Sequence, residues 1–231
     1  MALVLAGGMG SRMGRPKQFI DLLGVPALLY TLRAFEEAPE VARIYTVGDR
    51  FRIEGLVEEA DVSKYAGCAF PGESRSLSTR NGLSLLEEDL ETLVLIHDGS
   101  RCLVTPDLVG RVVAAAAGDP GADGVVPALP VSDTIKVAEN GAILETLDRT
   151  KLYTTQTPQA FRLGLLRKVF TGSEERFLTA TDDASLVEEA EGRVLVVAGE
   201  KTNIKLTSPD DLILAEAILD ARTSLSGRAQ S

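Results

Sequence analysis

Three basic side chains lie in a glycine-rich stretch near the start of the chain. Arg12, Arg15 and Lys17 occur in or just after residues 7–14, which contain four glycines, and no acidic residue precedes Asp21. Glycine tolerates the positive φ angles that bring backbone N–H groups close to a ligand, and such groups can converge on phosphate oxygens. A solvated turn is the alternative, but this concentration of cations in a chain of net charge −10 favours an anion site.

Two common phosphate-binding loops do not match this stretch. The P-loop requires Gly-Lys followed by Ser or Thr, and the sequence contains no such triplet. The dinucleotide fingerprint G-x-G-x-x-G begins at Gly8 and Gly10, but Met13 occupies its third glycine position. Pro16 also prevents one uninterrupted helix from starting at the loop. The apolar residues 2–6 predict a buried strand, so the pattern is a long basic glycine loop that follows a strand.

A second candidate group follows the most apolar run, residues 92–96. His97, Asp98 and Arg101 come after this run, and open α/β sheets bind ligands at the carboxyl ends of their strands. Asp98 is a candidate Mg²⁺ ligand, because Mg²⁺ is held by one or two carboxylates plus substrate phosphates; a turn or capping aspartate is the alternative. His97 is expected to be structural, since no dyad partner is evident. Residues 181–184 have the pattern of a helix N-terminus, which caps the helix or binds an anion.

The elements that must position these groups alternate along the first 130 residues. Short β-rich runs predict strands, and apolar residues at helical spacing or capping signals predict helices. The expected strands are 2–6, 41–47, 64–70, 92–96 and 124–129, and the expected helices are 26–37, 51–60, 74–86 and 106–117. This alternation predicts an α/β fold with a doubly wound, mostly parallel sheet that helices cover on both faces.

The alternation breaks at residue 131. Residues 131–137 and 142–147 roughly alternate apolar and polar side chains around Asn140-Gly141, a strong hairpin signal. A two-stranded hairpin is not stable alone, so this β-arm, about residues 131–155, packs either on its own sheet or on a partner subunit. Beyond it we expect an extended segment to 161, helices at 163–170, 182–190 and 212–221, the last with Ser208-Pro209 at its start, and a strand at 193–197. We find no repeat or linker, so we expect one domain over 1–231 with the arm inserted.

The composition excludes several classes of protein. The chain has 231 residues, 45% hydrophobic and 25% charged, as in an ordinary globular protein. Its excess of acid argues against nucleic acid as a partner, and no apolar run approaches the ~20 residues that span a membrane. We expect no signal peptide before the first strand. With only Cys68, Cys102 and one histidine, a zinc site or disulfide framework is not expected, and the cytoplasm is the default location.

Eight motifs occur in a fixed order along the chain, at residues 5–13, 16–19, 97–101, 133–136, 148–149, 156–161, 181–184 and 203–212. Each motif is modest by itself, but the match extends from residue 3 to about 220. In this order they resemble the 2-C-methyl-D-erythritol 4-phosphate cytidylyltransferases of the non-mevalonate route to isoprenoids.

The resemblance implies transfer of a cytidylyl group from CTP to the phosphate of methylerythritol phosphate, with Mg²⁺ as cofactor and pyrophosphate as the second product. It makes Arg12 and Lys17 stabilisers of the reacting α-phosphate, and it places Lys205 beside the attacking phosphate. The implied nucleotide contacts are Ala6, Gly7, Gly8, Gly10, Gly72 and Ser78. The implied acceptor contacts are Asp98, which also serves the metal, Arg101, Thr134, Arg149, Thr157 and Thr181.

In this family the hairpin arm crosses to the neighbouring subunit, so the resemblance implies a homodimer in which Thr134 and Arg149 act in trans. Cys102 replaces the proline that usually follows Arg101, and Tyr153 stands where tryptophan is frequent. The residues 5–8, Leu-Ala-Gly-Gly, are shared with a sister enzyme that acts on ribitol 5-phosphate, which is the alternative within the class.

Two motifs discriminate between the candidate functions. Residues 133–136 and 148–149 favour methylerythritol phosphate over ribitol phosphate as the acceptor. A non-catalytic nucleotide-binding regulator on the same scaffold is a further alternative, since a fold does not fix function. The presence of Arg12, Lys17 and Lys205 together with Asp98 argues against it.

Overall fold

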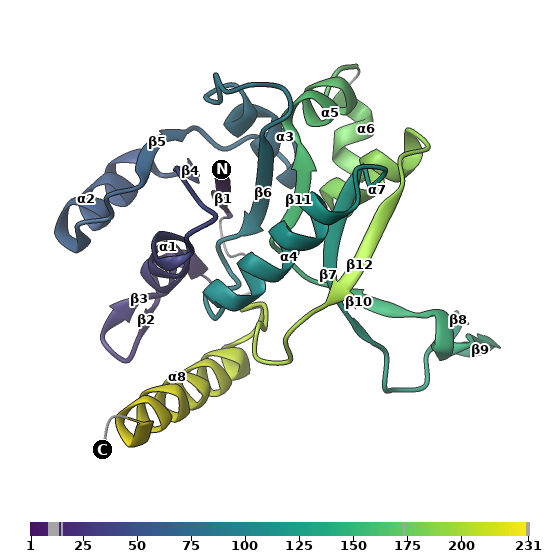
Figure 1. Cartoon of the computed structure of the whole chain (residues 1–231). Helices are drawn as coiled ribbons and strands as arrows, with labels where there is room; N and C mark the ends of the chain where they lie inside the picture. Colours follow the sequence, from purple (N-terminus) through teal and green to yellow (C-terminus); the bar gives the residue numbers. More distant parts are fainter. Residues whose placement is uncertain (9–13, 15, 173, 230–231) are drawn as a thin grey trace.

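An eight-stranded sheet forms the centre of the computed structural model, which describes residues 1–8, 14, 16–172 and 174–229 (Figure 1). Seven strands follow the order β10-β7-β11-β6-β1-β4-β5, and β12 also pairs with β7. The strands are β1 Ala2–Ala6, β4 Ile44–Gly48, β5 Tyr65–Ala69, β6 Leu93–Asp98, β7 Gly124–Pro130, β10 Tyr153–Thr155, β11 Gln159–Arg162 and β12 Val194–Ala198.

In the central sheet four of the seven strand pairs are parallel, as the alternating sequence pattern predicted. β1 runs parallel to both β4 and β6, β4 to β5, and β7 to β12. The extended segment before residue 162 forms β10 and β11, which are antiparallel to their neighbours. Successive strands β1, β4 and β5 lead away in one direction, and β6 then returns to the other side of β1. A ligand site is therefore expected where the carboxyl ends of β1 and β6 meet.

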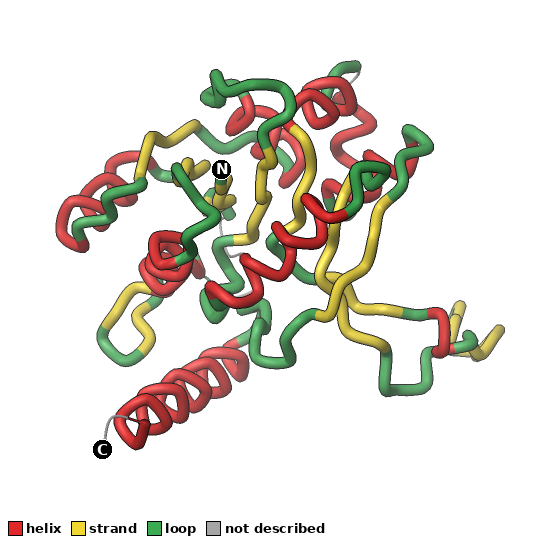
Figure 2. Tube along the Cα trace, in the orientation of Figure 1, coloured by secondary structure: helices red, strands yellow, loops and turns green. Residues whose placement is uncertain are grey.

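Alternate side chains of β1 belong to two separate cores on opposite faces of the sheet. Figure 2 shows helices on both sides of the strands. Ala2 and Val4 pack under α1 Ala27–Glu37, α2 Arg50–Ala60 and α4 Pro106–Gly118. Leu3 packs under α3 Arg75–Leu83, α5 Leu163–Val169, α6 Glu174–Thr179 and α7 Asp183–Glu189. Because side chains alternate along a strand, one short apolar strand holds both layers of helices together. The expected coverage of both faces is confirmed.

A third, smaller core joins the last helix, α8 Pro209–Ala229, to the rest of the molecule. It contains Leu22 of β2 Asp21–Leu22, with Cys102 and Leu206, and β2 pairs with β3 Val25–Pro26. We had not predicted β2 and β3, whose two residues each are too short for any periodicity. The short helix α6 was missed for the same reason. The last helix, α8, starts at Pro209, where a start at Ser208-Pro209 was expected, and it extends beyond its expected C-terminal end at Ala221. None of the helices described is long and apolar enough to cross a membrane.

The predicted hairpin forms and projects from the body of the molecule (Figure 1). Its strands are β8 Lys136–Glu139 and β9 Ala142–Thr146, joined by Asn140 and Gly141 at φ angles of 50° and 81°. Positive φ at both positions is the geometry of a tight two-residue hairpin turn. The first strand starts five residues later than expected, at Lys136 instead of 131. All side chains of β8 and β9 are exposed, so the hairpin does not pack on its own sheet.

Candidate active site

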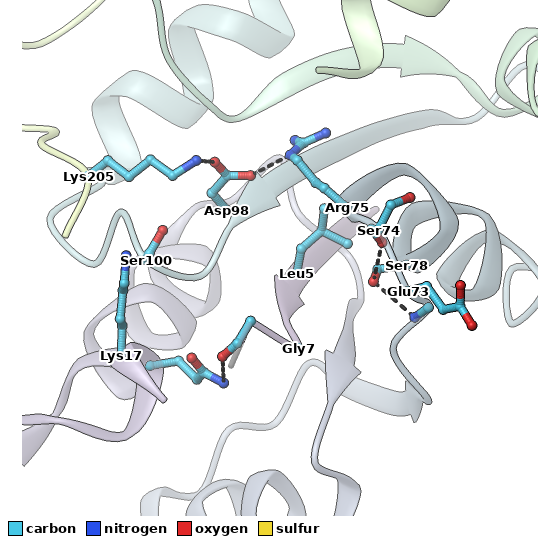
Figure 3. Close-up of a pocket in the computed structure, with 13 residues that line it drawn as sticks. Leu5, Gly7, Lys17, Glu73, Ser74, Arg75, Ser78, Asp98, Ser100 and Lys205 are labelled. Carbon is cyan, nitrogen blue, oxygen red and sulfur yellow. Dashed lines mark hydrogen bonds and ion pairs between the residues drawn. The ribbon is translucent and has the colours of Figure 1, made fainter. Parts of the chain in front are cut away.

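A cavity of about 410 Å³ lies at the carboxyl ends of β1 and β6, where the strand order reverses. The loop after β1 forms one side of it, the turn between β5 and α3 forms another, and the segment before α8 contributes Lys205 (Figure 3). Its lining residues are Leu5, Gly7, Gly8, Lys17, Gln18, Gly72, Glu73, Ser74, Arg75, Ser78, Asp98, Ser100 and Lys205. This volume lies in the range of cavities that hold small ligands.

Two of the predicted nucleotide-binding glycines are required by close packing. A Cβ atom at Gly7 would lie 2.4 Å from the Cβ atom of Pro71, and one at Gly72 would lie 2.5 Å from that of Leu77. The N–H of Gly72 donates to the Ser78 hydroxyl at 3.0 Å, and that hydroxyl in turn donates to the carbonyl of Ser74. These contacts hold the turn before α3 against the loop after β1, and so set the width of the cavity.

Lys17 enters the cavity on a single turn of 3₁₀ helix, η2 Lys17–Phe19. The buried Gln18 fixes this turn, because its Nε2 donates to the carbonyl oxygens of Ala6, at 2.6 Å, and Gly8, at 3.3 Å. The guanidinium of Arg52 also lies 4.0 Å from the centre of the Phe19 ring. These contacts tie Lys17 to the end of β1.

Asp98 lies between two cations at the inner end of the cavity (Figure 3). Its Oδ1 accepts from Nε of Arg75 at 2.9 Å, and its Oδ2 accepts from Nζ of Lys205 at 2.7 Å. Nη1 of Arg75 also donates to Oδ2 of the fully buried Asp183 at 2.6 Å. The four side chains come from β6, α3, α7 and the segment before α8, so a continuous ionic network joins distant parts of the chain.

The network sets the charges of its members. Burial alone would raise the pKa of Asp98, but Arg75 and then Lys205 outweigh it and hold that pKa well below its usual range. Burial would lower the pKa of Arg75, yet Asp183 and Asp98 raise it above its usual value. Both groups are therefore charged at neutral pH, in agreement with an ion pair that is mostly shielded from water.

A chain of hydrogen bonds through Thr157 and His97 fixes the backbone of Asp98. Burial lowers the pKa of His97 to about 4, so the ring is neutral at pH 7. Its Nε2 lies 3.2 Å from the carbonyl of Arg101, which can only accept, so Nε2 carries the proton. Nδ1 must then accept the hydrogen of the Thr157 hydroxyl, 3.0 Å away, while that oxygen accepts from the N–H of Asp98 at 3.0 Å. The structural role expected of His97 is thereby confirmed.

A smaller cavity of about 90 Å³ shares Arg75, Asp98 and Lys205 with the larger one. Arg101 and Thr181 line its other side together with Thr157. Arg101 is held in place by two donated bonds, to the carbonyls of Asn203 at 2.8 Å and Thr155 at 3.1 Å. The two cavities thus meet at one carboxylate and two cations, an arrangement suited to two anionic ligands.

The structure brings most of the predicted site residues to these two cavities. Gly7, Gly8, Lys17, Gly72, Ser78, Asp98 and Lys205 line the larger one, and Asp98, Arg101, Thr157, Thr181 and Lys205 line the smaller one. Ala6 lies behind the larger cavity and offers its carbonyl to Gln18. Gly10 and Arg12 lie outside the described residues. Thr157 lines the smaller cavity, as predicted for an acceptor contact, while the single hydrogen of its hydroxyl is used by His97 in this geometry.

Thr134 and Arg149 are placed differently. Both are exposed on the projecting arm, and neither lines either cavity of its own subunit. Nη1 of Arg149 donates to the carbonyl of Ser132 at 2.5 Å.

Arg75 and Gln18 are two residues of the site that the sequence motifs did not single out. Arg75 stands midway between Gly72 and Ser78, in the first turn of a helix that follows a strand. A cation is disfavoured at the positive end of a helix dipole. An arginine in the first turn of a helix therefore indicates that acidic side chains lie nearby, and this signal was present in the sequence. Gln18 carried no comparable signal.

The donor set of the site suits a divalent cation that enters with a polyphosphate. Asp98 and Glu73 are the carboxylates that line the larger cavity, and the described residues contain no cluster of acidic, cysteine and histidine side chains that could hold a metal alone. Mg²⁺ usually takes one or two carboxylates, with water and substrate phosphates as its remaining ligands. Each Asp98 oxygen has one lone pair left after its ion pair, so a bound ion could share this carboxylate.

The site has glycines and Lys17 after β1 at the switch point of a mostly parallel sheet, with Asp98 and Lys205 lining the same cavity. This is the arrangement of an α/β nucleotidyltransferase. The family model described as 2-C-methyl-D-erythritol 4-phosphate cytidylyltransferase matches residues 1–221. The chain belongs to this family of enzymes.

Curated relatives and solved structures agree with that assignment. A Rubrobacter xylanophilus protein of the same name is 64% identical over 228 residues, covering 99% of this chain and 98% of its own. A Bacillus velezensis protein of that name is 41% identical over 229 residues, covering 96% and 97%. The crystal structure of 4-diphosphocytidyl-2C-methyl-D-erythritol synthase from Anaerococcus prevotii superposes with a TM-score of 0.80 at 30% identity, covering 95% of each chain.

Proposed function

We propose that this chain transfers the cytidylyl group of CTP to 2-C-methyl-D-erythritol 4-phosphate and releases pyrophosphate, a step in isoprenoid precursor synthesis. Family membership supports the reaction class, and one structural observation supports the chemistry. Two cavities of unequal size meet at Asp98, Lys205 and Arg75, so that two anionic reactants can bind on either side of one charged junction.

The larger cavity is the proposed CTP site. The turn at Gly72 and Ser78 would enclose the base, and the loop after β1 would approach the triphosphate through its backbone. Lys17, with Arg12 from the same loop, would stabilise the charge that builds up on the α-phosphate. Preorganised cations aimed at developing charge are a major source of catalysis in phosphoryl transfer.

The smaller cavity is the proposed site of the acceptor phosphate. An oxygen of this phosphate attacks the α-phosphorus of CTP, a new P–O bond forms, and the bond from the α-phosphorus to the bridging oxygen breaks as pyrophosphate leaves. Lys205 has three N–H donors, so its ammonium can keep Asp98 and also bind the incoming phosphate. Arg101 and Thr181 would complete the pocket.

Magnesium is the proposed cofactor. Asp98 would hold it together with the triphosphate, and the ion would neutralise phosphate charge there. The two cysteines described are both free and buried, which supports the expected location in the cytoplasm.

The proposed assembly is a homodimer formed through the β-arm. The arm exposes Ile143 at 64% and Leu144 at 62%, and a two-stranded hairpin with its apolar residues in water has little stability of its own. A partner subunit that covers the arm would bury these side chains. It would also bring Thr134 and Arg149 to the partner's acceptor site, since they do not reach the site of their own subunit.

Incubation with CTP, Mg²⁺ and each candidate acceptor, followed by measurement of pyrophosphate release, tests the proposal. Turnover should be fastest with methylerythritol phosphate, and ribitol 5-phosphate is the competing acceptor. CTP should be used far better than ATP or GTP, with UTP the best competitor, because a pocket closed around a pyrimidine excludes purines by volume. Faster turnover with ribitol 5-phosphate would reassign the acceptor, and efficient use of ATP would contradict the base assignment.

A further inference from the structure

Arg75 occupies the centre of the site without any role in the proposed chemistry so far. Its guanidinium bonds Asp98 through Nε at 2.9 Å and Asp183 through Nη1 at 2.6 Å. It lines both cavities, and its side chain is 23% exposed. Its Nη2 is buried and has no hydrogen-bond partner in the part of the chain that is described.

The position of Arg75 is electrostatically unfavourable for the helix, and its acidic partners compensate for this. Arg75 is the first residue of α3, where the helix dipole disfavours a positive charge. Asp183 is completely buried, and its carboxylate also accepts from the Thr79 hydroxyl at 3.0 Å. Asp183 therefore anchors one edge of the guanidinium plane in the core between α3 and α7, and the other edge is left to bond Asp98.

We propose that Arg75 is a positioning residue for the transfer reaction: it fixes the Asp98 carboxylate at the junction of the two cavities, and through Asp98 it holds Lys205. The inference rests on the proposed function, because it gives Lys205 the task of binding the acceptor phosphate. Lys205 is 41% exposed and comes from a loop segment, so the bond from its Nζ to Oδ2 of Asp98 is the contact that sets its ammonium group. Asp98 can fix the position of Lys205 through Oδ2 only if Arg75 holds its other oxygen, Oδ1.

The planar fork of arginine is essential to this role. Nε and Nη1 diverge toward two different carboxylates, whereas a lysine offers one compact ammonium that cannot span both. Arg75→Lys should therefore keep the positive charge and most of the stability, but should not hold Asp98 and Asp183 together. A displacement of reacting groups by about 1 Å can cost on the order of 10²-fold in rate.

The test compares Arg75→Lys, Arg75→Gln and the double variant Arg75→Gln/Asp183→Asn with the wild-type full chain. Arg111→Gln is the matched control, because Arg111 also pairs with a carboxylate, Glu200, at 3.1 Å but lines neither cavity. Pyrophosphate release gives kcat and the KM of each substrate, and thermal unfolding gives Tm. Arg75→Gln should lose roughly 10 °C in Tm, since it leaves buried carboxylates without their partner.

The double variant Arg75→Gln/Asp183→Asn tests whether Arg75 positions Asp98 or only neutralises the charge of Asp183. Removing the charge of Asp183 should restore most of the lost Tm, while kcat stays about 10- to 100-fold below wild type and the KM for CTP changes less than about threefold. Arg75→Lys should show the same low kcat at near-normal Tm, and Arg111→Gln should resemble wild type.

Recovery of kcat along with Tm in the double variant, or normal kcat in Arg75→Lys, would overturn the positioning role and leave Arg75 as a stabiliser of the fold. Absence of pyrophosphate release from the wild-type protein would instead contradict the proposed function itself, so the two failures are distinguishable.

Discussion

Nζ of Lys205 lies 2.7 Å from Oδ2 of Asp98, although 107 positions separate the two residues in the chain. Asp98 ends β6, and Lys205 lies between β12 and α8. The pair lies where the larger and the smaller cavity meet, because both residues line both cavities. Because Asp98 is buried and Lys205 is half-exposed, the lysine is the more accessible member of the pair.

The Lys205→Gln substitution should mainly affect the acceptor. We expect the KM for methylerythritol phosphate to rise and kcat to fall, together by about 10²-fold in kcat/KM, as for the loss of one charge-assisted contact of about 3 kcal/mol. The KM for CTP should stay close to normal. Lys201→Gln is the control, since Lys201 is exposed in the same segment and lines neither cavity. An unchanged acceptor KM and kcat would remove Lys205 from the mechanism.

The Lys17→Ala substitution should lower kcat by roughly 10² or more, because one preorganised contact to the transition state contributes ~3 kcal/mol. Lys17 lines the larger cavity on a turn that Gln18 fixes. Steady-state turnover with saturating CTP measures the effect, and Lys168→Ala, an exposed change on α5, is the control. Near-normal turnover would show that Lys17 does not act on the α-phosphate.

Gly72→Ala should weaken CTP binding and destabilise the fold. The added methyl would lie 2.5 Å from Cβ of Leu77 and 2.7 Å from its backbone carbon, so α3 must move away from the turn. We expect the KM for CTP to rise at least about tenfold and stability to fall by about 1–3 kcal/mol.

Gly55→Ala is the matched control for Gly72→Ala. Gly55 lies within α2, and an added Cβ meets nothing within 4 Å. Alanine should there raise stability by about 0.5–1 kcal/mol and leave the KM for CTP unchanged. Denaturant unfolding and steady-state kinetics measure both variants, and normal CTP binding by Gly72→Ala would contradict the assigned role of this turn.

Arg149→Ala should raise the KM for the acceptor while leaving CTP binding largely intact. If the arm acts in trans, mixing this variant with Lys17→Ala should restore activity to about a quarter of wild type. Random exchange makes about half of the dimers mixed, and one of the two sites in each mixed dimer is intact. Absence of recovery, after subunit exchange has been demonstrated directly, would mean that the arm serves its own subunit.

Asp211 should make the stability of the protein depend on pH. Burial would raise its pKa, but bonds from Thr207 and Ser208 outweigh burial and lower the pKa to about 2. Since the folded pKa lies below the unfolded value of about 3.9, the carboxylate stabilises the fold above that value, and the contribution is lost as the pH falls toward 2.

Asp211→Asn should therefore lower Tm at pH 7, by an amount equivalent to roughly 0.5–1 kcal/mol, and have less effect near pH 2. Asp210→Asn is the control, since Asp210 occupies the same helix turn, whereas the bonds from Thr207 and Ser208 go to Asp211. An equal loss of Tm at both pH values would contradict the assignment.

Motifs along the chain were sufficient to predict Lys17, Asp98 and Lys205 as residues of the site, and all three line the larger cavity. Lys17 comes after β1 and Asp98 ends β6, so the rule that ligands bind at strand ends predicted one site for both. Arg75 was not found this way. Its importance depends on two carboxylates, Asp98 and Asp183, that are 23 and 108 residues away in sequence.

By itself, the sequence determined the α/β alternation, the hairpin turn at Asn140 and Gly141, and the family, since these depend on local propensity, periodicity and motif order. Only the tertiary structure decided which side chains pair. The Thr157 hydroxyl donates to His97 and not into the cavity, because β6 and the turn before β11 place the two 3.0 Å apart. A hydroxyl has a single hydrogen, and which acceptor takes it depends on distances that no local pattern encodes.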